Sequence, residues 1–216
     1  MALLPGGGIS TFTGIAMQAG NQIIGGTGVL DAPLLQDIAL RAANGVGSVA
    51  LPVRIQDGTD ATGPDLFFHN TSTTTGDIAV SFVAGGVTIN DDVIGTFNAN
   101  PNGAYSIQVE TGNFTLDAPF LPGLTTADPL LAGQKVLVHA VAGDVIVNGP
   151  NGGPGGSIVT SGGGFTELIG NNVIQTAGSN ISGTLNAFAD IAISMTQAGD
   201  YTLGVMEAPT VTLTAT

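Results

Sequence analysis

Apolar and polar residues alternate in short runs along most of this chain, and the runs are separated by Gly, Asn, Asp and Pro. Val211 and Leu213, for example, alternate with threonines in the last strand-like stretch. A period of two is typical of a β-strand, because successive side chains point to opposite faces. The sequence predicts about a dozen short strands: Ser48–Ile55, Gly76–Ala84, Val87–Ile89, Ala104–Val109, Asn113–Leu116, Lys135–Val141, Asp144–Asn148, Ser157–Thr160, Val173–Thr176, Asp190–Thr196, Tyr201–Met206 and Thr210–Thr214.

Many short strands joined by regular turns favour a mainly β fold, an antiparallel β-sandwich or jelly roll with one short helix. An irregular β-solenoid is the alternative, because the sequence after residue 150 is rich in glycine. A Gly-Asp pair followed by alternating apolar residues also recurs at Gly76, Gly143 and Gly199. These Gly-Asp pairs are not separated by a fixed number of residues, so a regular repeat is not established.

The short helix is predicted over Asp31–Asn44. Asp31 is a suitable N-cap, Ile38 and Ala42 recur at helical spacing, and Gly45 provides a stop.

Glycine content and hydrophobicity divide the chain into two parts. Residues 1–30 form a Gly-rich, apolar segment with few ways to bury itself, which predicts an N-terminal arm. Residues 31–216 are expected to form a single β-rich domain. The Gly- and Pro-rich stretch at 149–164 is long enough to be a flexible boundary inside it.

The charge balance excludes several partners. The formal net charge is -13 with only three Lys and Arg, and 9% of residues are charged, against about 25% in an ordinary domain. Three cations cannot neutralise a phosphate backbone, which argues against nucleic acid and anionic membrane surfaces. No apolar run approaches the ~18 residues that a spanning helix needs, so membrane insertion is not expected.

The absence of cysteine excludes disulfides and thiolate metal sites. Met1–Gly6 has no positively charged n-region. Either a leader was removed before this numbering, or the chain is exported without an N-terminal signal peptide. In composition, the acidic, cysteine-free, Gly-rich chain resembles the substrates of bacterial type I secretion. That resemblance implies an extracellular or cell-surface location.

Asp57, Asp60 and Asp65 are the best metal-ligand candidates, since three carboxylates fall in one Gly-containing loop. Carboxylate and carbonyl oxygens suit Ca²⁺. A solvated turn is the competing interpretation, because Asp and Gly are also default turn formers. Asn90–Asp92 is a second, weaker cluster.

The two histidines, His69 and His139, have no catalytic partners at a recognisable spacing, and no serine lies in a nucleophile elbow. The sequence therefore predicts a protein that is not an enzyme and uses no cofactor other than Ca²⁺. Asn70, Asn113 and Asn180 each begin a glycosylation sequon.

The leading functional hypothesis is a secreted structural protein that assembles with itself, as a subunit of an extracellular filament, biofilm matrix or surface layer. Few charges make subunit faces easier to desolvate. Both ends of the chain are strand-like, and a strand exchanged with a neighbour contributes main-chain hydrogen bonds. The residues expected to carry assembly are Ile9, Phe12, Ile15, Val211 and Leu213.

Two alternatives belong to other classes. The first is an adhesive β module that binds carbohydrate or ice, although exposed Trp and Tyr, which sugar platforms use, are scarce. The second is a viral coat or decoration protein, which would share the jelly-roll pattern.

Overall fold

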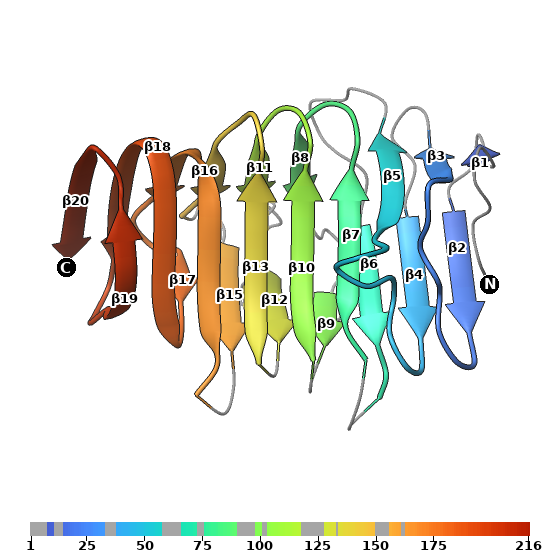
Figure 1. Cartoon of the computed structure of the whole chain (residues 1–216). Coiled ribbons are helices and arrows are strands. Elements are labelled where there is room, and N and C mark those ends of the chain that lie inside the picture. Colours follow the sequence, from blue (N-terminus) through green and yellow to red (C-terminus); the bar gives the residue numbers. More distant parts are fainter. Residues whose placement is uncertain are drawn as a thin grey trace, which may run out of the picture.

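A computed structural model of the chain describes residues 8–10, 15–32, 38–57, 66–72, 76–89, 98–100, 103–117, 128–132, 134–149, 156–160 and 163–216. In this part of the chain the structure is mainly β and contains no helix. The strands stack side by side along one axis, with β1 and β2 at one end of the stack and β19 and β20 at the other (Figure 1).

One wall of the stack is an all-parallel, curved run of nine strands that forms a half-barrel. In spatial order these are β1 (Gly8–Ser10), β3 (Val29–Ala32), β5 (Val53–Asp57), β7 (Ile78–Phe82), β10 (Ala104–Val109), β13 (Lys135–Ala140), β16 (Phe165–Gln175), β18 (Thr184–Gln197) and β19 (Thr202–Glu207).

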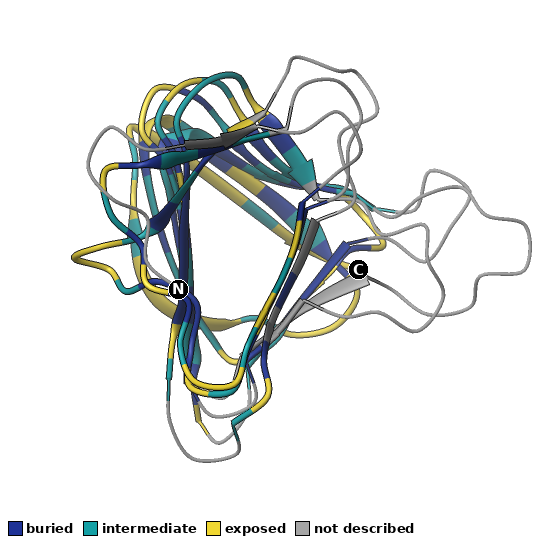
Figure 2. Ribbon diagram, turned by 90° about the vertical axis from the view of Figure 1, so that its right-hand side faces the viewer, coloured by how far each residue is buried: buried dark blue, intermediate teal, exposed yellow. Residues whose placement is uncertain are grey.

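Two further walls close the stack. One contains β8 (Val87–Ile89), β11 (Phe114–Leu116), β14 (Val145–Val147), the second halves of β16 and β18, and β20 (Thr210–Ala215). The other is a seven-stranded sheet of β2 (Ile15–Ala19), β4 (Ile38–Ala42), β6 (Leu66–Asn70), β9 (Asn98–Asn100), β12 (Asp128–Ala132), β15 (Gly156–Thr160) and β17 (Asn180–Ile181). Viewed along the stack, the ribbons form a three-sided ring (Figure 2).

The predicted antiparallel sandwich or jelly roll is wrong. Every ladder between the named strands is parallel, as in the pairing of Ala104 with Lys135 and of Lys135 with Phe165. We call one passage of the chain around the three walls a coil. A strand does not pair with the strand just before it in the chain; it pairs with the strand of the same wall in the next coil. Parallel neighbours need a long connection, and here the other two walls provide it.

The predicted helix is also wrong. The described parts of Asp31–Asn44 are extended: Asp31 lies in β3, and Ile38–Ala42 forms β4. The alternating burial of β4 places Ile38, Leu40 and Ala42 inside. Ile38 and Ala42 are separated by four residues, a spacing that one face of a strand shares with one face of a helix. The pattern was therefore ambiguous.

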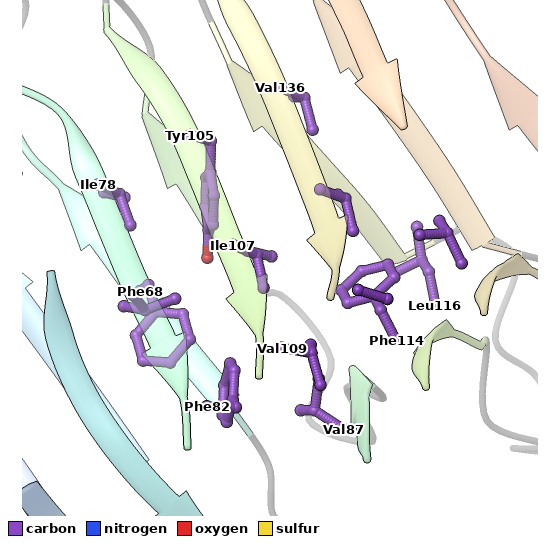
Figure 3. Packing of buried hydrophobic residues seen from close by; sticks show 14 of the residues in the cluster. Phe68, Ile78, Phe82, Val87, Tyr105, Ile107, Val109, Phe114, Leu116 and Val136 are labelled. Carbon is purple, nitrogen blue, oxygen red and sulfur yellow. The ribbon is translucent and has the colours of Figure 1, made fainter. Parts of the chain in front are cut away.

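A single hydrophobic core fills the ring (Figure 3). Inward side chains at matching register positions lie next to one another from coil to coil, so they form columns along the stack. One column runs through Ile78, Tyr105, Val136, Thr166 and Leu185. A second runs through Val87, Phe114, Val145, Val173 and Ile193. Every member of both is at most 2% exposed.

Coil length varies along the stack. Ala104 on β10 lies opposite Lys135 on β13, a step of 31 residues, whereas Thr184 on β18 lies opposite Thr202 on β19, a step of 18. The long coils carry extra residues between strands. These insertions remove any constant period from the sequence, although the strand register is kept.

The arm and boundary predicted from composition fall on partly described segments. β1 and β2 pair with β3 and β4, so residues on either side of position 30 share ladders. Within the 149–164 stretch, β15 pairs with β12 and β17.

Candidate functional site

The last coil exposes hydrophobic side chains at positions that are buried one coil earlier. Leu203 on β19 lies opposite Leu185, and Val211 on β20 lies opposite Ile193. Leu185 and Ile193 are 1% and 0% exposed, whereas Leu203 and Val211 are 46% and 42% exposed. These two positions continue the two core columns, and no other described strand covers them.

The backbone of this coil is also unpaired on its outer side. Among the described strands, β19 and β20 each pair with β18 and with no other strand. Leu213 on β20 lies opposite Met195 and packs partly against the core. We call Leu203, Val211 and Leu213, with the outer edges of β19 and β20, the open end. An apolar core that ends without a polar cap is a site for association in stacked repeat architectures.

The residues predicted to carry assembly lie at the two ends of the stack. Ile9 on β1 pairs with Leu30, and Ile15 on β2 is 5% exposed and belongs to the core. Val211 and Leu213 lie at the open end, and Phe12 is outside the described residues. Their role in assembly stays a prediction. The sequence analysis missed Leu203, although the alternation in Tyr201–Met206 was a signal for it.

A groove with a volume of about 330 Å³ lies on the outer face of the nine-strand run, near the open end. Its walls include four residues in one row across consecutive strands: His139, Ile169, Phe188 and Glu207. Asp190 lies at the same groove. The groove therefore combines an apolar floor with carboxylates and an imidazole, which can hold a small polar ligand with an apolar face.

The predicted calcium loop is only partly described. Asp57 is the last residue of β5, while Asp60, Asp65 and the second cluster Asn90–Asp92 lie outside the described residues. Within the part of the chain that the structure describes, no three His, Asp or Glu side chains gather where they could hold a metal ion. Calcium binding by Asp57, Asp60 and Asp65 stays a prediction.

The two histidines lie on different sheets. His69 is in β6, opposite Arg41 and Ala99, and its predicted neighbour Asp65 is outside the described residues. His139 is in β13 and faces the groove. The structure assigns neither a reaction, and the absence of enzymatic activity stays a prediction.

Buried amides form two networks that the sequence analysis did not anticipate. Asn70 donates to the Asn100 side-chain oxygen at 3.0 Å, and Asn100 donates to the carbonyls of Gly76 and Ala104 at 3.1 and 2.7 Å. Nearer the open end, Gln175 donates to the Gln197 side chain at 3.2 Å. These bonds join successive coils and satisfy backbone groups at the corners, which a buried polar atom requires.

One sequon is affected by this arrangement. Asn70 is fully buried and its amide is engaged in the network, so it is unsuited to carry a glycan in the folded chain. The amides of Asn113 and Asn180 belong to exposed residues.

Two of the three basic side chains are already paired. Arg54 lies 3.3 Å from Glu110, and Lys135 lies 3.5 Å from Glu167. With these two cations paired and a net charge of -13, the surface carries a large excess of negative charge. The strands β1, β2 and β20 contribute no charge to this surface, because they contain no charged residue.

Comparison with known proteins gives no relative. No protein-family model matches the chain, and no curated protein or solved structure is detectably similar to it. Among the described residues, no helix is long and apolar enough to cross a membrane.

Proposed function

We propose that this chain is a structural subunit that associates with copies of itself through the open end. One observation carries the proposal: Leu203 and Val211 continue buried core columns yet remain 46% and 42% exposed. Covering side chains of this size is worth about 1.5–3 kcal/mol each when burial is complete. Association is the direct way for a folded chain to gain that energy.

Composition supports the same proposal. β19 carries one charged residue, Glu207, and β20 carries none, so little charge must be desolvated when the open end is covered. The large negative net charge opposes close approach of two copies at low ionic strength. Assembly should therefore strengthen with added salt, which screens that repulsion.

An extracellular assembly fits these features best, as a filament, a biofilm matrix or a surface layer. The chain uses no cysteine and covers itself with hydroxyl, amide and glycine residues instead of charges. Fractionation of the producing cells tests the location. Recovery only from the cytoplasm would contradict it.

Substitution at the open end tests self-association. We expect the purified chain to show a concentration-dependent increase in mass by light scattering, and Val211→Asp to reduce the association constant at least 10-fold. Val141→Asp is the matched control, because Val141 is 47% exposed and lies at the turn after β13, which β16 and β18 separate from β19. A chain that stays monomeric at all concentrations and salt levels would contradict the proposal, and so would an equal effect of both substitutions.

The groove favours a second candidate function, adhesion to carbohydrate. Phe188 and Ile169 offer an apolar surface, and His139, Asp190 and Glu207 offer hydrogen-bonding groups around it. We expect Phe188→Ala to abolish any retention on neutral oligosaccharides. Phe165→Ala should leave this retention unchanged, because Phe165 lies on the same sheet but does not line the groove. Its ring contacts Lys135 instead. Absence of retention by the unmodified chain would reject this candidate.

A further inference from the structure

Both ends of the nine-strand run have an unpaired edge. Among the described strands, β1 pairs only with β3, and β19 pairs only with β18. The seven-stranded sheet likewise begins at β2, which pairs only with β4. The stack thus has two different ends, and Figure 1 shows them at opposite sides of the molecule.

The strands that begin the stack are mainly apolar and uncharged. Ile9 on β1 lies at the register position of Leu30, which is fully buried. Met17 on β2 lies opposite Leu40, which is 1% exposed, but Met17 itself is only partly buried. Among the described strands, the beginning of the stack therefore has mainly apolar strands that pair on one side only.

Strand direction makes the two ends compatible. All strands of the nine-strand run are parallel, so β19 of one copy and β1 of another have the same direction when two stacks share an axis. A copy placed in this way would continue the parallel ladder of the nine-strand run and cover Leu203, which ends one core column. Neither β1 nor β2 carries a charge, so the matching surface is uncharged as well.

We propose that copies join head to tail, with β19 at the open end of one subunit pairing with β1 of the next. This inference rests on the proposed self-association and specifies its geometry. Because the two contacting surfaces differ, the interface is heterologous. Each added subunit presents a new open end, so the assembly is a filament that does not close.

The rival geometry places two open ends against each other. β19 would then meet β19 about a twofold axis, and the two strands would run antiparallel. Such an isologous contact uses the open end of both subunits and stops at a dimer.

Cysteine crosslinking separates the two geometries, because the chain contains no cysteine of its own. Val205→Cys places a thiol on β19 at a position that is 54% exposed, and Ser10→Cys places one on β1. Neighbouring strands lie about 4.8 Å apart, within reach of a short bis-maleimide. We expect the double variant to form a ladder of covalent dimers, trimers and larger species, and each single variant to form none above background.

The background is set by Val141→Cys, an exposed position away from both ends. Covalent dimers from Val205→Cys alone would overturn the head-to-tail geometry and leave self-association standing, and so would a double variant that assembles but gives no ladder. Light scattering on the unmodified chain tests self-association itself. A chain that stays strictly monomeric would overturn both the proposed self-association and the head-to-tail geometry.

Discussion

The last coil of the stack and the coil before it contain the same inward residues in different surroundings. Leu185 and Leu203 occupy consecutive positions of one column, yet one is buried and the other is nearly half exposed. The local pattern that turns each side chain inward is the same on both strands. Burial differs because Leu185 has a strand on both sides, whereas Leu203 has a strand on one side. In this fold a coil does not bury its own core; its neighbours do.

The polar groups differ in the same way. Asn100, in the middle of the stack, is fully buried and makes three side-chain hydrogen bonds to Asn70, Gly76 and Ala104. Asn186, on β18 beside the last coil, is only partly buried, and its side-chain oxygen accepts one bond from the Val205 amide at 2.8 Å. The Asn100 amide is therefore bonded within the protein, whereas the Asn186 amide can also bond to water.

The largest expected difference comes from one substitution made at both leucines. Leu185→Ala should lower the free energy of unfolding by about 2–5 kcal/mol, because it leaves a cavity in a packed column. Leu203→Ala should cost about 1 kcal/mol or less, since water already reaches that side chain. Urea unfolding at a concentration where the chain is monomeric measures both. Equal losses of unfolding free energy would show that Leu185 and Leu203 are packed alike.

The two asparagines give a smaller contrast. Asn100→Ala should cost about 1–3 kcal/mol, because the Ala104 carbonyl loses its side-chain donor, the Gly76 carbonyl loses one of two, and the buried Asn70 amide loses an acceptor. Asn186→Ala should cost about 1 kcal/mol or less, since the exposed Val205 amide can bond to water. The midpoint of thermal unfolding, read for both variants in one buffer, compares them. A larger shift for Asn186→Ala would reverse the interpretation.

The smallest effect appears only at high pH, at the two tyrosines. Burial raises the pKa of Tyr105 well above its ordinary value, and burial raises the pKa of Tyr201, beside the last coil, as well. An unfolded phenol ionises near pH 10. The folded state holds its proton longer, so stability is unaffected below about pH 10 and falls as the pH rises above it.

Tyr105→Phe should therefore flatten this loss, by up to about 1.4 kcal/mol for each pH unit above 10. Tyr201→Phe should flatten it less, because Tyr201 is only partly buried and its hydroxyl donates to Gln175 at 3.1 Å. Unfolding measured at intervals from pH 8 to 11.5 gives both slopes. Identical slopes for the parent chain and Tyr105→Phe would show that Tyr105 ionises freely in the folded state.

Part of the candidate site could be predicted from sequence. The alternation in Thr210–Thr214 identified Val211 and Leu213 as a strand face, and the structure places both residues in core columns. The same alternation did not show that Val211 would be exposed, because exposure depends on the strand that follows it in space. The groove was not predicted at all. Its row of His139, Ile169, Phe188 and Glu207 comes from four strands spread over more than sixty residues.

By itself, the sequence determined the β character of the chain, the turns that separate its strands and the side of each strand that is apolar. These follow from local alternation and from Gly, Asn and Asp in turns, which need no distant partner. Only the tertiary structure decided that strands pair in parallel with the next coil. It also decided that Ile38–Ala42 is a strand, and that Leu203 and Val211 are 46% and 42% exposed. Those outcomes depend on which segments meet across steps of 18 to 32 residues, and steps of unequal length leave no period in the sequence.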